Sequence, residues 1–287
     1  MPKVRIVTDS TAHFEDLDFP RKHNVAIVPL AIHFGKDSFR DGVNITTESF
    51  YNLVETTGLL PTAASPTPEQ FAAVYEEIAR TGDSIVSIHL SSKLGRAWRN
   101  ASAASEPLLG RCNIQVIDSL STSLGLGWLV EAAARAAEAG ETADEIVRIV
   151  RGLTHRLYIV FFVETPAFLA NNKRFGKAQA ALSPMLGIKP FLSIEDGDIV
   201  PMEKVRSRQQ AVEKLIEFVS EFSHVEHLAI LQSSPVPSDD SHQLLNQLAI
   251  NFPGRKFPVV AYGPSLATYI GPGGMGVIVF EGEPGDD

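Results

Sequence analysis

Residues 84–92 read Ser84-Ile85-Val86-Ser87-Ile88-His89-Leu90-Ser91-Ser92, a mostly apolar run that ends on two hydroxyl residues. The apolar side chains predict a buried strand, and the two serines mark its end and the beginning of a helix. Two other runs have the same form: residues 4–7 lead into Thr8-Asp9-Ser10-Thr11, and residues 114–117 lead into Asp118-Ser119. Helical patterns separate these strands. The alternation predicts a mostly parallel, doubly wound sheet in the first half of the chain.

The second half of the chain predicts a domain with a mixed sheet. Residues 189–194 and 199–205 are strand-like and flank Glu195-Asp196-Gly197-Asp198, which is a hairpin signature. We therefore expect an α/β fold with two domains: an N-terminal α/β domain at 1–155 and a C-terminal α/β domain at 156–287. We expect the final segment of the second domain to return to the domain interface.

Length and composition restrict the class of protein. The 287 residues are 44% hydrophobic and 21% charged, which is typical of globular domains and excludes disorder as the main state. The net charge of −9 argues against nucleic acid or an anionic membrane as the main partner. A single cysteine, Cys112, excludes an internal disulfide framework and a multi-cysteine metal site. We expect Cys112 to be a buried structural thiol.

No part of the sequence predicts a targeting or membrane segment. The first residues lack the long apolar stretch of a signal peptide, and the apolar run at 157–163 is far too short to span a bilayer. We therefore expect a soluble, cytoplasmic protein with no transmembrane segment, for which transient contact with a membrane surface remains open.

The hydroxyl residues that follow the three strands predict a binding site. Carboxyl ends of parallel strands meet at one edge of a sheet, where hydroxyls and helix N-termini can hold an anion. The alternative is that each hydroxyl only caps the helix that follows it. The sequence has no GxxxxGK[ST] motif, so a single carboxylate fits the site better than a polyphosphate. A GxSxG nucleophile motif is also absent.

A glycine-rich segment near the end of the chain is a second candidate. Residues 271–276 read Gly271-Pro272-Gly273-Gly274-Met275-Gly276, and Tyr269 lies just before them. Glycine permits close approach of the backbone to a ligand or to another strand, but a tight turn without a binding role fits equally well. Tyr269 can present a hydroxyl beside an apolar surface.

Several short motifs, in order along nearly the whole chain, resemble the DegV family, which includes the fatty-acid-binding subunits of bacterial fatty acid kinase. The motifs are Val7-Thr8-Asp9-Ser10-Thr11, Asp41-Gly42-Val43-Asn44-Ile45-Thr46, Ile88-His89-Leu90-Ser91-Ser92, Val116-Ile117-Asp118-Ser119, Leu186-Gly187-Ile188-Lys189-Pro190 and Gly271-Pro272-Gly273. The resemblance implies two α/β domains with a long-chain fatty acid, such as palmitate, between them. It implies no cofactor and no enzyme activity in this chain. The acid would pass to a separate ATP-dependent kinase subunit that makes an acyl phosphate for phospholipid synthesis.

The resemblance also implies site residues. Ser92 matches the second serine of the family's SS motif, which holds the carboxylate. The family's TSQPS loop aligns with Ala63-Ala64-Ser65-Pro66-Thr67, so Thr62 or Ser65 substitutes for its hydroxyls, or the loop contributes backbone groups. Tyr269 stands where the family has a histidine, and Arg174 matches an arginine associated with the kinase step. The ligand-binding residues expected on this basis are Ser91, Ser92, Thr62, Ala63, Ser65, Thr268 and Tyr269.

Two other functions stay open at the level of sequence. The first is an enzyme acting on a small carboxylate or an ester, which would need a base beside Ser92; His89 is the nearest histidine in the sequence. The second is a lipid-sensing regulator that has kept the fold but has no kinase partner.

Overall fold

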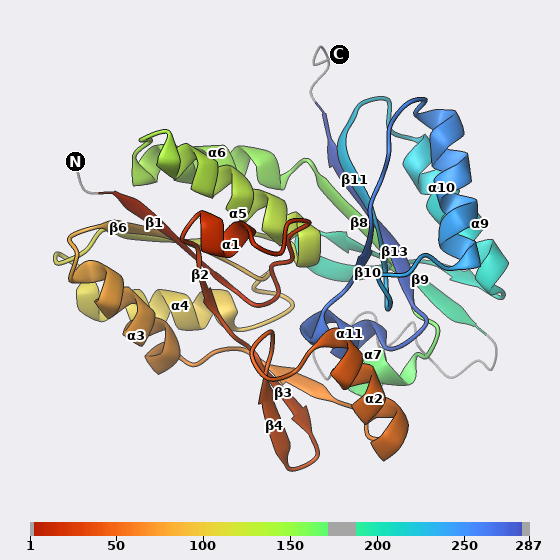
Figure 1. Cartoon of the computed structure of the whole chain (residues 1–287), viewed down its shortest axis with the longest axis horizontal. Helices are drawn as coiled ribbons and strands as arrows, with labels where there is room; N and C mark the ends of the chain where they lie inside the picture. Colours follow the sequence, from red (N-terminus) through yellow and green to blue (C-terminus); the bar gives the residue numbers. More distant parts are fainter. Residues whose placement is uncertain (1–2, 172–187, 283–287) are drawn as a thin grey trace. The chain divides into compact units, whose positions relative to one another are not determined.

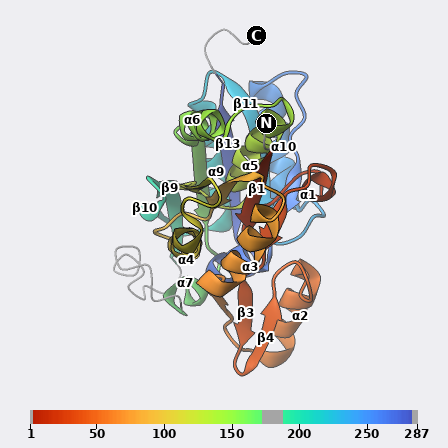
Figure 2. The same ribbon diagram turned by 90° about the vertical axis from the view of Figure 1, so that its left-hand side faces the viewer.

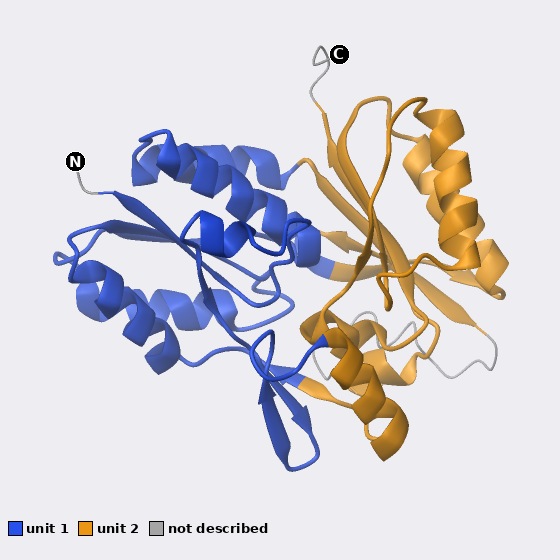
Figure 3. Ribbon diagram, viewed as in Figure 1, with its two compact units in different colours: residues 1–46, 63–155, 196–198 blue, residues 47–62, 156–195, 199–287 orange. Residues whose placement is uncertain are grey.

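The computed structural model describes residues 3–171 and 188–282, which form two compact units (Figure 3). Unit 1 comprises residues 1–46, 63–155 and 196–198, and unit 2 comprises residues 47–62, 156–195 and 199–287. The chain thus passes from unit 1 to unit 2 between His155 and Arg156. Two shorter segments are exceptions: residues 47–62 belong to unit 2, and residues 196–198 belong to unit 1. The α/β class is confirmed, with a parallel sheet in unit 1 and a mixed sheet in unit 2.

The main sheet of unit 1 has four parallel strands. In spatial order they are β2 (Ala26–Val28), β1 (Val4–Asp9), β6 (Ser84–His89) and β7 (Ile114–Asp118). The chain runs from β1 outwards to β2 and later returns on the other side of β1 to form β6 and β7. This reversal between β1 and β6 is a topological switch point, the position at which open α/β sheets place their ligands.

Helices cover both faces of this sheet (Figure 1). One face carries α5 (Ser123–Glu138) and α6 (Ala143–Thr154), and the other carries α3 (Pro68–Ala79) and α4 (Ala97–Ser105). Helix α3 begins at Pro68, where Thr67 and Gln70 form a capping box. The unit is completed by the short elements α1 (Phe19–Lys22) and η1 (Glu106–Leu108).

A small second sheet lies beside the parallel one. Its strands are β4 (Asp37–Arg40), β3 (Ala31–Phe34) and β5 (Thr62–Ala64). The apolar run at 25–34 is interrupted at Pro29, so that it forms β2 and β3 separately. Figure 2 shows β3 and β4 extending away from the parallel sheet of unit 1.

Unit 2 is built on a six-stranded sheet with one parallel pair, β11 with β12. The strands are, in order, β10 (Asp198–Val205), β9 (Lys189–Glu195), β8 (Leu157–Phe162), β13 (Met275–Glu281), β11 (Val225–Gln232) and β12 (Val259–Ala261). The hairpin predicted around Gly197 joins β9 to β10. Helices α9 (Arg208–Ser220) and α10 (Asp239–Asn251) pack over the sheet, and a core of mostly aliphatic side chains is buried between the helices and the sheet.

Within the described residues, unit 2 has three further helices, each shorter than α9 and α10. They are α2 (Thr47–Thr57), α7 (Ala167–Asn171) and α11 (Pro264–Ile270), of which α7 and α11 pack against each other. Across residues 3–171 and 188–282, every helix is too short or too polar to cross a membrane.

Candidate functional site

The segments that follow β1, β6 and β7 lie together at the carboxyl edge of the parallel sheet in unit 1. The end of β6 is tied on both sides: Leu90 N donates to Asp9 Oδ2 over 3.0 Å, and Ser92 N donates to Asp118 Oδ1 over 3.1 Å. Both carboxylates therefore hold backbone N–H groups of the segment that carries the two serines. We call this edge, residues 8–11, 90–92 and 118–121, the strand-end rim.

A buried hydrogen-bond chain supports the strand-end rim from below. Asp9 Oδ2 lies 3.0 Å from His89 Nδ1, and His89 Nε2 lies 2.7 Å from Ser87 Oγ, which also accepts from Tyr75 Oη over 2.8 Å. Burial raises the pKa of Asp9, but hydrogen bonds from His89, from Thr11 and from Leu90 N outweigh it and hold that pKa below its usual value. Asp9 is therefore a buried carboxylate whose accepting positions are filled from within the protein.

The two serines begin a tight turn and not a helix. Leu94 N and Gly95 N both donate to Ser91 O, over 2.9 and 3.0 Å, and Arg96 N donates to Ser65 Oγ over 2.9 Å. Helix α4 begins only at Ala97, so the prediction that a helix follows Ser92 directly was wrong. The backbone N–H groups of residues 92–96 therefore all have acceptors in the protein, which leaves side chains as the available donors.

The hydroxyls of Ser91 and Ser92 differ in their surroundings. Ser91 is fully buried; its Oγ donates to Gly197 O over 2.6 Å and accepts from Lys93 N over 3.3 Å. Ser92 is half-buried, and its Oγ has no hydrogen-bond partner within residues 3–171 and 188–282. It does not cap α4 either. Of the two serines, only Ser92 keeps a hydroxyl that is uncommitted among the described side chains and backbone groups.

Of the segment at residues 62–65, Ser65 contacts this turn. Ser65 Oγ accepts from Arg96 N, and a side chain at Gly95 would collide with Leu90 and press on Ser65 Oγ, so the loop and the turn pack tightly. Ala63 lies half-buried in β5 and offers only backbone groups. Thr62, in the same strand, is half-buried and is grouped with unit 2.

The other predicted ligand residues lie in unit 2, on α11. Thr268 is fully buried, and its Oγ1 donates to Ser265 O within the helix over 2.8 Å. Tyr269 is half-buried in the last turn of α11, beside the glycine-rich segment. Arg174 lies outside the described residues, as do Leu186 and Gly187 of the motif that precedes β9.

The glycine-rich segment packs against unit 2 itself. Gly271 has a φ of +70°, and a Cβ there would lie 2.5 Å from the Phe168 ring. A Cβ at Gly274 would lie 2.2 Å from Ile270, and its carbonyl, like that of Gly271, accepts from Tyr262 Oη. These contacts explain the glycines as a close-packed turn between α11 and β13.

An ion-pair group holds the same turn. Arg208 Nη1 donates to Gly273 O and contacts Glu164, which also pairs with Lys189, while Arg208 Nε contacts Asp240. Glu164, Arg208 and Asp240 carry no motif that marks them in the sequence, because they are far apart along the chain. In the parts of the chain that the structure describes, no three histidine, cysteine or acidic side chains gather as metal ligands would. Cys112 is half-buried, and its Sγ donates to Asp83 O over 3.2 Å.

Comparison with known proteins places this fold in a defined group. The family model described as "Uncharacterised protein, DegV family" matches residues 3–282. The structure of DegV, a fatty acid binding protein from Bacillus subtilis, superposes with a TM-score of 0.86 at 25% identity, covering 98% of this chain and 100% of that one. A fatty-acid-binding DegV family protein from Thermus thermophilus gives 0.85 at 28% identity, covering 97% and 99%.

A third solved structure supports the fold alone. The Streptococcus pneumoniae Fatty Acid Kinase (Fak) B3 protein, loaded with linoleic acid, has a TM-score of 0.82 at 19% identity, with 98% of this chain and 100% of that chain covered. The family model, which spans nearly all of the described residues, settles the assignment: the chain is a member of the DegV family.

Proposed function

We propose that this protein binds a long-chain fatty acid and that the hydroxyl of Ser92 donates a hydrogen bond to its carboxylate. The observation that carries the proposal is the contrast between the two serines of the strand-end rim. Ser91 Oγ donates to Gly197 O, whereas Ser92 Oγ has no partner among the described residues. The fatty acid binding of the Bacillus subtilis and Thermus thermophilus proteins supports the choice of ligand.

The remaining ligand contacts are part of the same proposal. Ser65 Oγ accepts from Arg96 N, which leaves its own proton for an acceptor, and the half-buried Tyr269 carries a phenol hydroxyl that can donate to a carboxylate. Ser91 and Thr268 donate their hydroxyl protons to Gly197 O and Ser265 O, so we assign them to the support of the site. Thr62 and Ala63 stay predictions as contacts from the β5 loop.

The alternative of an ester-processing enzyme lacks support, because His89 is not placed to act as the general base that it would need. Both ring nitrogens of His89 are occupied, Nδ1 by Asp9 and Nε2 by Ser87, and the side chain is fully buried. A general base must reach the proton that it abstracts, directly or through one water. His89 is engaged below the strand-end rim and makes no hydrogen bond to Ser92, so the observations favour binding over hydrolysis.

We further propose that the bound acid is presented to a separate ATP-dependent kinase, for which the Streptococcus pneumoniae Fatty Acid Kinase protein is the precedent. Arg174, outside the described residues, remains the predicted contact to that kinase. Arg174→Ala should then leave fatty acid binding intact and slow formation of the acyl phosphate. Equal rates for the variant and the wild type would remove Arg174 from this role.

Extraction of the purified protein with organic solvent, followed by mass spectrometry, tests the binding proposal. We expect about one long-chain acid per chain. A protein that carries no acid, and still takes up none after incubation with palmitate, oleate or stearate, would contradict it. Ester hydrolysis in the absence of a bound acid would instead favour the enzyme.

A further inference from the structure

Three exposed cations follow Ser92 closely in the sequence. They are Lys93, Arg96 and Arg99, and the surrounding residues 84–105 contain neither aspartate nor glutamate. The whole chain, in contrast, has a net charge of −9. We call the three side chains the α4 basic patch. The patch is a local concentration of positive charge on an acidic protein, and it begins beside the serine to which we assign the fatty acid carboxylate.

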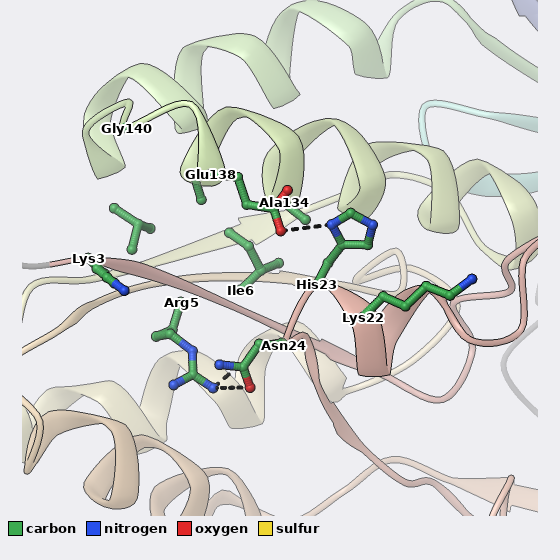
Figure 4. Close-up of a pocket in the computed structure, with 11 residues that line it drawn as sticks. Lys3, Arg5, Ile6, Lys22, His23, Asn24, Ala134, Glu138 and Gly140 are labelled. Carbon is green, nitrogen blue, oxygen red and sulfur yellow. Dashed lines mark hydrogen bonds and ion pairs between the residues drawn. The ribbon is translucent and has the colours of Figure 1, made fainter.

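The cations of the α4 basic patch have no counterion within residues 3–171 and 188–282. Their side chains form neither an ion pair nor a hydrogen bond there. Basic side chains elsewhere in unit 1 do have partners, as around the hollow at the amino end of β1 (Figure 4). There, Arg5 Nη2 donates to Asn24 Oδ1 over 2.8 Å. His23 Nδ1 lies 2.8 Å from Glu138 Oε1. The patch, unlike that hollow, has its charges available for an anion from outside the chain.

Hydrogen bonds fix the backbone that carries the patch. The turn after Ser92 closes on Ser91 O, and at its end Arg96 N donates to Ser65 Oγ over 2.9 Å. Arg96 is the N-cap residue of α4, and Arg99 lies three positions later, a spacing that makes side chains neighbours on a helix. The backbone is thus held beside Ser92, while the long cationic side chains are exposed and able to gather around a bound anion.

The α4 basic patch carries more positive charge than a carboxylate needs. A fatty acid carboxylate has one negative charge, for which the Ser92 hydroxyl is a donor. A phosphate monoester carries about −1.5 to −2 at neutral pH and has three strong acceptor oxygens. Arginine donates parallel hydrogen bonds to a phosphate, and lysine meets it as a compact point charge. Two arginines and one lysine therefore match a phosphate group better than a carboxylate.

We propose that the α4 basic patch holds the phosphate group of the acyl phosphate that forms on the bound fatty acid. This inference rests on the proposed function, in which the carboxylate is presented to a kinase. In that reaction a carboxylate oxygen attacks the γ-phosphorus of ATP, the bond from this phosphorus to the β,γ-bridging oxygen breaks, and ADP leaves with the electron pair. The new phosphate is then attached to the headgroup beside Ser92, where the patch retains it.

Hexadecyl phosphate is a stable probe for the phosphate headgroup, and palmitate is its carboxylate counterpart with the same number of carbons. Displacement of a fluorescent fatty acid from the full-length protein measures both affinities. We expect hexadecyl phosphate to bind at least as tightly as palmitate at low ionic strength, and this preference to fall as salt screens the exposed cations. A protein that binds palmitate but not hexadecyl phosphate would overturn the inference and spare the proposed function. A protein that binds neither would contradict both.

Variants identify the residues. Arg96→Gln and Arg99→Gln should each weaken hexadecyl phosphate binding by about 2- to 5-fold, the range for exposed charge pairs, and together by about 4- to 25-fold if the effects add. Palmitate binding should change by less than about 2-fold. The matched control is Arg80→Gln, because Arg80 is also exposed and unpaired but lies at the other end of α3. Equal losses for both ligands, or an equal loss in Arg80→Gln, would overturn the inference.

Phosphorus NMR of bound hexadecyl phosphate provides a readout that an effect on folding would not move. Nearby cations favour the dianion, so the second pKa of the bound phosphate should lie below its free value of about 6 and return towards it in the double variant. A patch that serves to contact an anionic membrane would behave differently. The pKa of the bound phosphate would then stay near 6, while the variants lose binding to phosphatidylglycerol vesicles, and this result would overturn the inference.

Discussion

Asp9 Oδ2 lies 3.0 Å from Nδ1 of His89, and both side chains are fully buried. Because a carboxylate only accepts hydrogen bonds, Nδ1 must donate to it, while Nε2 lies 2.7 Å from Ser87 Oγ. The same oxygen of Asp9 holds Leu90 N, two residues before Ser92. The Asp9–His89 pair therefore holds the end of β6 in place and so positions Ser91 and Ser92 at the strand-end rim.

Asp9→Asn should destabilise unit 1 strongly. The amide keeps the shape of the carboxylate but cannot accept with both ends, so at least one of the donors His89, Thr11 and Leu90 N loses its partner. We expect a loss of about 3 kcal/mol or more in the free energy of unfolding, as for other broken buried pairs. Urea denaturation at neutral pH measures it.

Tyr75→Phe is the matched control for Asp9→Asn. It removes only the outermost hydroxyl of the same chain, which donates to Ser87 Oγ over 2.8 Å. Its cost should be about 1 kcal/mol. If the two variants lose equal stability, Asp9 contributes no more to the buried hydrogen-bond chain than its outermost hydroxyl does.

His13 should make the protein sensitive to mild acid. Burial lowers the pKa of His13 to about 4, from an ordinary value of 6.5. Below 6.5 the unfolded chain therefore binds a proton that the folded chain refuses, and stability is lost as the pH falls from 6.5 towards 4. In His13→Gln, the loss of unfolding free energy between about pH 7.5 and pH 4.5 should be smaller than in the wild type by about 2 kcal/mol.

The exposed His242 on α10 provides the comparison for this pH effect. His242→Gln makes the same substitution at an exposed position and so measures the effect of the exchange itself. A His13→Gln protein that loses stability with acid as steeply as the wild type would show that His13 accepts its proton in the folded state.

Gly271→Ala should lower the free energy of unfolding by more than the positive φ of this residue alone explains. Gly254 has a similar φ, +80° against +70°, but a Cβ at Gly254 meets nothing within 4 Å, whereas at Gly271 it meets the Phe168 ring at 2.5 Å. Gly254→Ala should thus cost about 1–2 kcal/mol, and Gly271→Ala roughly 1–3 kcal/mol more because of the crowding. Thermal unfolding of both variants gives the comparison, and similar melting temperatures would show that Phe168 moves aside freely.

Local signals in the sequence are sufficient to identify the elements that depend on neighbouring residues. The capping box of Thr67 and Gln70 needs only four adjacent residues, and Pro29 interrupts the run at 25–34 by its own chemistry. The strand-end rim also followed from sequence, because carboxyl ends of parallel strands meet by geometry. The β3–β4 hairpin was missed, since Asp37–Arg40 is polar and gives no strand pattern.

What the sequence could not predict depends on partners that are distant along the chain. Ser91 and Ser92 are adjacent and chemically identical, yet Ser91 is committed by Gly197, 106 residues away. Helix α4 begins at Ala97 and not directly after Ser92, because the N–H groups of residues 94–96 donate hydrogen bonds to Ser91 and Ser65. Residues 47–62 belong to unit 2, and no local sequence pattern indicates this.

The pair Ser92→Ala and Ser91→Ala separates ligand binding from support of the turn. If the Ser92 hydroxyl bonds the fatty acid carboxylate, Ser92→Ala should weaken binding by about 1.5–3 kcal/mol, the range for hydrogen bonds to charged groups. Its stability without ligand should match the wild type, since Ser92 Oγ has no partner among the described residues. Titration of a fluorescent fatty acid, with urea denaturation of the ligand-free proteins, measures both quantities.

Ser91→Ala should show the reverse. It leaves Gly197 O and Lys93 N without the hydroxyl that now satisfies them, at a cost of about 1–3 kcal/mol in the unfolding free energy of the ligand-free protein. The headgroup contact itself should survive, because Ser92 N still donates to Asp118 and keeps that residue in place. Equal losses of affinity in the two variants would mean that the turn as a whole, and not the Ser92 hydroxyl, determines binding.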